Sequence, residues 1–427
     1  MTDVAKAWWP HLYTPKLVTT FVDGYGLADL RRDAVAGLTV AVVALPLSMA
    51  IAIGSGVSPG QGLITSVVGG LLVSALGGSR FQIGGPAGAF IVLVATTVAK
   101  FGVDGLALAV LMSGALLALG GALRLGELVR RMPHAVTVGF TAGIALIIFA
   151  GQLKDLFGLH LTGAEPGPVI PKLMALGRAW STVSPATLIL GLCVAGATIA
   201  FRRWRPMWPG MLIAVAAASV VAFLLKLPVV TIGARFGELP HGLSAPHLPE
   251  MSMARILAIA PSALSFTLLG GIESLLSAVV ADGMTGRQHR PNIELIAQGA
   301  ANIGSALFGG ICVTGTIART ATNVRAGARS PVSGVLHALF VLAFMMLAAP
   351  LASYIPISAL AGVLVVVAWN MVEKRELAVL LRSWKAALVV ATTFGLTIAR
   401  DLTTGIVAGC AVAFLLYLLH RRGARLA

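Results

Sequence analysis

Long apolar stretches recur along almost the whole chain, from about residue 34 to residue 420. Hydrophobic residues make up 57% of the sequence and charged residues only 11%, which excludes an ordinary soluble domain. A helix needs about 20 apolar residues to cross the hydrocarbon core of a bilayer. Since every backbone polar group in lipid must be bonded within the protein, helices are the expected spanning elements. The pattern predicts an all-α polytopic membrane protein whose membrane domain covers residues 34–420.

Counted in such lengths, the apolar stretches predict fourteen transmembrane segments. Two of them, near 87–99 and 317–327, are too short to cross the bilayer alone. The other segments lie near 34–53, 61–77, 104–122, 134–153, 185–201, 210–226, 261–281, 294–309, 332–349, 356–371, 386–399 and 402–420.

The two short segments follow matching stretches of sequence. Residues 74–100 and 305–331 both begin with Ser-Ala-Leu, pass through glycines and a few extended residues, and restart a helix at Gly-Pro-Ala-Gly or Thr-Gly-Thr-Ile. Seven segments in each half is an odd number, so the second half would insert upside down. We therefore expect inverted repeats at about 34–226 and 261–420, with two half-helices (segments 3 and 10) that meet at a central binding site.

The basic residues carry a topology signal. The net charge is +15, and with both ends on one side 22 of the Lys and Arg residues fall on that side and 8 on the other. The positive-inside rule then places both termini in the cytoplasm, with residues 1–33 as an N-terminal arm and 421–427 as a tail. This distribution argues against a nucleic-acid partner. No cleavable signal peptide is apparent, which favours a multi-pass protein of a bacterial-type cytoplasmic (inner) membrane.

Glu273 and Arg319 are the two formal charges that we expect deep inside helices. Ionisable residues at such depth usually face a pathway or a partner, and an ion pair that merely ties two helices together is the alternative. Arg319 lies at the start of a short helix, where N–H groups are free. Two helix N-termini contribute about +1 together, so with Arg319 and Glu273 the site carries about +1 and suits a small inorganic anion.

Hydroxyls and backbone N–H groups complete this predicted site. We expect Pro46 to kink the first helix in mid-span, and Ser48 is a candidate to face the site. For the threonines, helix capping and packing are the alternative. The candidate substrate-binding residues are Ser48, Ala87, Gly88, Ala89, Thr316, Ile317, Ala318, Arg319 and Thr320.

Glu273 is the candidate coupling residue. If it takes up a proton or holds Na⁺, the site becomes more positive and the anion binds better. Ser277, one turn later, is a candidate second Na⁺ ligand, and simple helix packing is its alternative. The sequence contains no metal-binding HExxH and no nucleotide-binding loop. It therefore predicts no enzyme and no cofactor beyond a coupling ion.

Five stretches resemble the SulP (sulfate permease) family of anion transporters: AGLTVAVVALPLSMAIA, GGSRFQIGGPAGAFIVLV, GGIESLLSAVVADGMTGRQHRPNIELIAQGAANI, TGTIARTATNVRAGARSP and RDLTTGIVAGC. The resemblance implies a seven-plus-seven inverted repeat with a mobile core (helices 1–4 and 8–11) and a gate (helices 5–7 and 12–14). It also implies elevator-type movement, a homodimer, and an anion held between the half-helices beside the first helix.

The sequence departs from the family pattern at several places. A cytoplasmic STAS domain usually follows the membrane domain, and we expect none here. Glu273 stands where sodium-coupled bicarbonate members carry Asp, which favours H⁺ coupling or exchange. Leu47 and Ala87 stand where several animal members carry Gln and Phe.

Together these features predict a secondary active transporter of small inorganic anions, with bicarbonate or sulfate ahead of chloride or dicarboxylates. It would be H⁺ or Na⁺ coupled, or an exchanger. The alternatives are an uncoupled anion channel on the same fold, a nucleobase transporter of the related fold, and a membrane scaffold that transports nothing.

Overall fold

The computed structural model describes residues 13–129, 133–163, 166, 169–205, 208–400 and 402–423. Residues 1–12 of the predicted arm and 424–427 of the predicted tail lie outside these ranges. Within the described part, secondary structure is helical except for two strands of two residues each.

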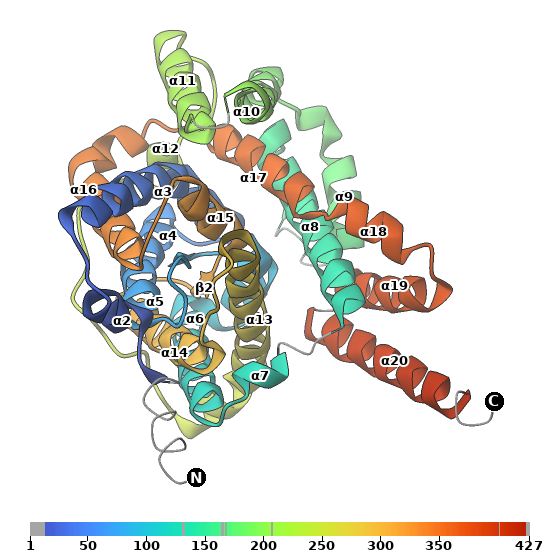
Figure 1. Cartoon of the computed structure of the whole chain (residues 1–427). Helices are drawn as coiled ribbons and strands as arrows, with labels where there is room; N and C mark the ends of the chain where they lie inside the picture. The colour runs from blue at the N-terminus through green and yellow to red at the C-terminus, as the bar shows by residue number, and fades with distance from the viewer. Residues whose placement is uncertain are drawn as a thin grey trace.

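The helices form two groups (Figure 1). The first group, on the left in that view, contains α2 (Lys16–Val22), α3 (Leu27–Gly54), α4 (Pro59–Ile64), the π-helical turn η1 (Thr65–Gly69), α5 (Gly70–Leu76), the 3₁₀ turn η2 (Gly88–Phe90), α6 (Ile91–Ala122), α7 (Gly126–Val129), α13 (Met253–Thr285), α14 (Pro291–Leu307), α15 (Ile317–Arg325) and α16 (Val332–Ala352).

The second group contains α8 (His134–Phe157), α9 (Val169–Arg178), the 3₁₀ turn η3 (Trp180–Thr182), α10 (Pro185–Trp204), α11 (Gly210–Leu224), α17 (Ile357–Met371), α18 (Lys374–Leu380), α19 (Trp384–Ala399) and α20 (Leu402–Gly423). The short helix α12 (Ile232–Phe236) lies between α11 and α13 in the chain. Each group draws its helices from both halves of the sequence.

Eight helical spans in the described ranges are long and apolar enough to cross a membrane. Three shorter apolar helices, Gly210–Leu224, Trp384–Ala399 and Thr404–Leu419, accompany them. The chain is therefore a mostly helical, multi-pass membrane protein.

Two helices begin earlier than the hydropathy pattern predicts. α3 begins at Leu27 and not at residue 34, because a carboxylate oxygen of Asp29 accepts the N–H of Gly26 at 3.5 Å and starts the helix within the predicted arm. α13 begins at Met253 and not at 261, since the Ser252 hydroxyl accepts the N–H of Arg255 at 3.3 Å. Such caps extend a helix through polar residues that hydropathy assigns to loops.

A glycine divides α6 near the predicted boundary between the segments 87–99 and 104–122. Gly102 has φ 71° and ψ −178°, which is outside the helical region. This backbone conformation is one that residues with a Cβ rarely adopt. The chain thus turns at Gly102 between two helical stretches.

The two strands join the matching segments of the sequence. β1 (Gly84–Gly85) pairs antiparallel with β2 (Thr314–Gly315), in the register Gly84 with Gly315 and Gly85 with Thr314. The N–H of Thr316 donates to the carbonyl of Ile83 at 3.1 Å and extends the pairing. Both strands are buried. The segments that precede η2 and α15 therefore meet inside the protein.

Side chains bond the extended backbone on both sides of this pairing. Asn302 bonds both the N–H and the carbonyl of Val313 at 2.9 Å, and Thr65 accepts the N–H of Ile311 at 2.7 Å. In the other segment, Asn323 donates to the carbonyl of Phe81 at 2.9 Å. Since lipid offers no water, these side chains replace the ladder that the short strands lack.

The contacts gather the arginine-rich loops at one end of the molecule. Arg80 pairs with Asp23 at 2.6 Å, and Nη1 of Arg290 donates to the carbonyl of Thr14 at 2.5 Å. The N–H of Arg329 donates to Asp33 at 2.7 Å. All of these cations belong to the loops that the charge distribution places on one side.

Close approach of α6 and α14 yields a test of the packing. A Cβ on Gly299 would lie 2.6 Å from the carbonyl oxygen of Gly114 and 2.6 Å from the nitrogen of Ala118. Gly299→Ala should therefore lower stability by about 1–3 kcal/mol, the usual cost of overpacking, measured as a lower unfolding temperature in detergent. The control is Gly395→Ala, since a Cβ there meets nothing within 4 Å. Equal unfolding temperatures for the two variants would contradict this packing.

Candidate functional site

The starts of η2 and α15 carry unused hydrogen-bond donors. No side chain caps the helix start at Ala87 or at Thr316. The first N–H groups of a helix have no partner within it, so those of α15 are open to a ligand. The hydroxyl oxygen of Thr316 is buried and has no partner in the described part of the chain. β1 and β2 pair directly before these starts, and since the pairing is antiparallel, η2 follows one end of it and α15 follows the other.

These helix starts lie where the two helix groups meet. A Cβ on Gly88 would approach Ile148 of α8 at 3.3 Å and Met371 of α17 at 3.6 Å. Both neighbours belong to the second group, whereas Gly88 belongs to the first. Ala318, at the start of α15, is exposed, and Ile317 is half-buried.

Arg319 lies among two hydroxyls of the first helix group and the backbone before η2, and its contact with the anion stays a prediction. Its guanidinium donates to the hydroxyls of Ser48 at 3.0 Å and Ser66 at 3.1 Å. It also donates to the carbonyls of Pro86 at 3.3 Å and Gly84 at 3.5 Å. The side chain is 1% exposed, and its Nε has no partner among the described residues. All four acceptors are neutral, so the positive charge is not cancelled by a carboxylate.

Gly85 makes this position of the guanidinium possible. The residue has φ 158°, and a Cβ there would overlap Nη1 of Arg319. The guanidinium thus lies directly against the backbone of β1.

Ser66 is a site residue that sequence reasoning missed. It lies in η1, and its hydroxyl lies 2.8 Å from that of Ser48. The Thr-Ser pair within an otherwise apolar segment was the available signal. π-Helical turns inside α-helices are frequent at functional sites.

Glu273 and Arg319 form no ion pair in the described structure, so the alternative of a simple helix-tying pair is wrong. Glu273 lies on α13, and its Oε2 is buried without a partner. One turn before it, the carbonyl of Gly270 accepts the hydroxyl of Thr314 at 3.4 Å, which places this part of α13 beside β2.

Ser277 and Thr320 lie together, one turn along α13 from Glu273. The Ser277 hydroxyl donates to that of Thr320 at 3.1 Å, and Thr320 accepts the N–H of Ile83 at 3.2 Å. Both side chains are fully buried. Their hydroxyls thus hold the extended segment before β1.

Two further carboxylates are buried, near the starts of their helices and not deep inside them. Glu294 in the first turn of α14 accepts the N–H groups of Gly78 at 2.8 Å and Ser79 at 3.0 Å. Asp33 accepts the N–H of Arg329 and the Ser330 hydroxyl. Both residues are 0% exposed. Hydropathy places them at segment ends, but the loops fold over them.

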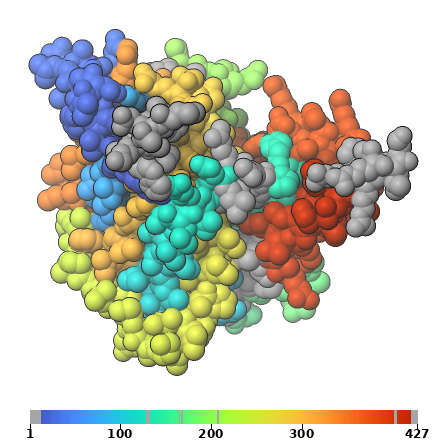
Figure 2. Space-filling model, turned by 60° about the horizontal axis from the view of Figure 1, so that its bottom comes forward, coloured from blue at the N-terminus to red at the C-terminus, as the bar shows by residue number. Residues whose placement is uncertain are grey.

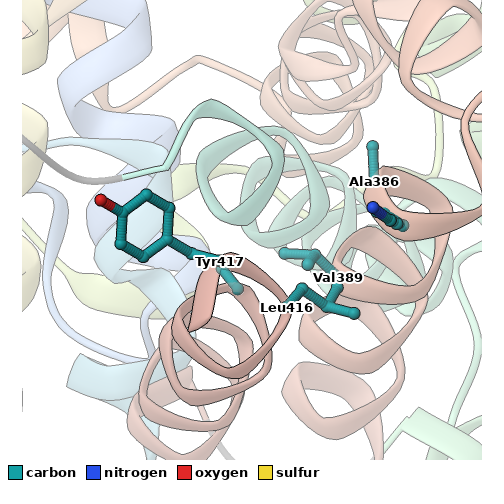
Figure 3. A pocket seen from close by; sticks show the side chains of 6 residues that line it. Ala386, Val389, Leu416 and Tyr417 are labelled. Atoms are coloured by element: carbon teal, nitrogen blue, oxygen red, sulfur yellow. The ribbon is translucent and has the colours of Figure 1, made fainter. Parts of the chain in front are cut away.

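No group of three or more His, Cys, Asp or Glu side chains in the described ranges could hold a metal ion. A groove of about 380 Å³ lies between α19 and α20, lined by Lys385, Ala386, Val389, Ala413, Leu416 and Tyr417 (Figure 3). Its lining is mostly apolar and shares no residue with the network around Arg319. We therefore place the candidate site at the helix starts.

Known proteins are similar to this chain in sequence and in fold. The model of the sulfate permease family matches residues 30–393. The putative sulfate transporter YvdB of Bacillus subtilis is 41% identical over 92% of this chain and 75% of its own length. The bicarbonate transporter BicA of Picosynechococcus is 33% identical over 90% of this chain and 69% of its own length.

Solved structures agree with these matches. The transmembrane domain of a cyanobacterial BicA superposes with a TM-score of 0.81 at 32% identity, covering 89% of this chain and 98% of that domain. Murine Slc26a9, an anion transporter in the inward-facing state, gives a TM-score of 0.87 at 18% identity, covering 97% of this chain and 72% of that one. The second likeness concerns the fold alone. The chain belongs to the sulfate permease family, a family of membrane transporters and not of enzymes.

Proposed function

We propose that this protein is a secondary transporter of small inorganic anions, with bicarbonate or sulfate as its substrate. The observation that carries the proposal is the pair of uncapped helix starts joined by β1 and β2, with the unpartnered hydroxyl of Thr316 beside them. The relatives named for sulfate and bicarbonate transport support this substrate class.

The electrostatics of the site favour an anion. Each helix start contributes about half a positive charge, and Arg319 adds a full charge that its neutral acceptors leave uncancelled. The N–H groups of Gly88, Ala89, Ile317 and Ala318 are the proposed direct donors, with the Thr316 hydroxyl. Arg319 and Ser48 act from behind β1: the first supplies charge, and the second holds its guanidinium. Oxyanions such as sulfate offer several acceptor oxygens to such donors.

Glu273 is the proposed coupling residue. Its buried, unpartnered carboxylate oxygen fits a proton or Na⁺. The Ser277 hydroxyl donates to Thr320 and keeps lone pairs with which it serves as a second Na⁺ ligand. Uptake of either cation removes a negative charge near β2 and tightens anion binding. By linkage, the anion tightens cation binding equally.

We propose alternating access by movement of the two helix groups against each other. We infer that α3–α6 and α13–α16 form the mobile core and that α8–α11 and α17–α20 form the gate, as an inverted seven-plus-seven repeat with half-helices at η2–α6 and α15. The helix starts at the boundary between the groups support an elevator-type movement of core against gate. The proposed setting is a homodimer in the inner membrane with cytoplasmic termini.

Uptake into proteoliposomes tests the function. The protein should accumulate radiolabelled bicarbonate or sulfate when a pH or Na⁺ gradient is imposed, and it should not take up a nucleobase. If the anion only equilibrates down its own gradient, whatever cation gradient is imposed, the protein would instead be an uncoupled anion channel.

Arg319→Ala should abolish this uptake, because the site loses its full positive charge. Ser66→Ala keeps the charge but removes one acceptor of the guanidinium. A hydrogen bond to a charged group contributes about 1.5–3 kcal/mol, so uptake should fall about tenfold or more. The control is Ser219→Ala on α11, whose hydroxyl bonds only the carbonyl of Val215, at 2.8 Å. Wild-type uptake by a monodisperse Arg319→Ala protein would refute the site.

Glu273→Gln should leave anion flux down its own gradient but remove its dependence on the H⁺ or Na⁺ gradient. The amide keeps the shape of the side chain and neither ionises nor holds Na⁺ as a carboxylate does. Glu294→Gln is the matched control, because that carboxylate is engaged by backbone N–H groups and should affect stability instead of coupling. Gradient-driven accumulation by the Glu273→Gln variant would exclude this role.

A further inference from the structure

A basic hollow lies at the end of the molecule where α3 begins. It has a volume of about 480 Å³ and is lined by Arg31, Arg32, Val35, Ala326, Gly327 and Arg329. The arginines are exposed, and within the described ranges none of their guanidinium groups takes part in an ion pair or hydrogen bond. Three unpaired guanidinium groups around one hollow form a site for an anionic ligand.

Asp33 holds the two walls of this hollow together. It accepts the N–H of Arg329 at 2.7 Å and the hydroxyls of Ser330 at 2.5 Å and Tyr25 at 3.0 Å. This fixes the loop after α15 against α3. Its carboxylate is fully buried and bonded to these donors, so it pairs with none of the three guanidinium groups. Asp29, the other acid near the start of α3, accepts the N–H of Gly26.

An apolar track continues from the hollow along α3. Leu27, Arg31, Val35 and Leu38 follow one another at helical spacing and share one face of the helix. Leu27 is 78% exposed, Val35 62% and Leu38 43%. Because α3 is apolar and long enough to span a membrane, this face leads from the arginines towards the hydrocarbon. A ligand that fills both parts has an anionic head and an apolar tail.

We propose that this hollow binds the phosphate headgroup of an anionic phospholipid, with one acyl chain along Val35 and Leu38. Basic pockets beside transmembrane helices on the cytoplasmic side suit such headgroups. Figure 2 shows the blue segment that contains α2 and the start of α3 at an edge of the molecule, where surrounding lipid can reach it. The proposal rests on the membrane orientation of α3 and is independent of which anion is transported.

The test is a titration of the full chain, purified in detergent, followed by native mass spectrometry. Phosphatidylglycerol should bind at lower concentration than phosphatidylcholine, and inorganic phosphate should not displace it. The triple change Arg31→Gln, Arg32→Gln and Arg329→Gln should weaken binding at least about tenfold, since each cation near a membrane surface contributes about 1 kcal/mol. The matched control changes Arg202, Arg203 and Arg205 to Gln, which removes the same charge at the exposed end of α10.

Each contrary result overturns the proposal. Equal loss of binding in both triple variants would mean general charge attraction and no site. Displacement by inorganic phosphate would show a site for free anions. Val35→Asp places a carboxylate on the apolar track and changes no arginine, so it should also weaken phosphatidylglycerol binding. Unchanged binding by this variant would refute the proposed contact with an acyl chain. This test does not use transport assays, so a negative result would refute lipid binding and would not affect the proposed transport function.

Discussion

The pairing of β1 with β2 is the interaction on which the candidate site depends. Non-helical backbone inside a membrane protein must find all of its hydrogen bonds within the protein. Two residues from each strand pair with each other, and Asn302, Thr65, Asn323 and Thr320 bond the neighbouring backbone. With the extended segments fixed in this way, η2 begins after one end of the antiparallel pairing and α15 begins after the other.

Arg319 differs from the buried carboxylates in the hydrogen-bond partners that its charged group has. Asp33 and Glu294 accept N–H and hydroxyl donors that stabilise their negative charge. Among the described residues, Arg319 donates only to neutral oxygens, and its Nε has no acceptor. Burying a charge without a counter-ion costs free energy. An anion held at the helix starts would offset that cost, so the buried charge of Arg319 favours anion binding.

The sequence predicted those parts of this arrangement that depend on the lengths of the apolar segments and on the positions of glycines. The matching segments before η2 and α15, the break near Gly102 and the burial of Arg319 all follow from apolar length and glycine placement. The direction of the Arg319 side chain did not follow, because it depends on the register of β1 against β2. Ser66, Asp33 and Glu294 were missed for a related reason: each acquires its role from a segment distant in the sequence.

Two of the three glycines in the pairing, Gly85 and Gly315, lie directly against a side chain. A Cβ on Gly85 would overlap the guanidinium of Arg319, and one on Gly315 would overlap the carboxamide of Gln82. One strand thus lies against a charge and the other against a neutral amide. Gln82 donates to the hydroxyl of Ser274 at 2.8 Å and to its carbonyl at 3.1 Å. Ser274 directly follows Glu273, so the proposed cation site lies on a stretch of α13 that is bonded to the segment before β1.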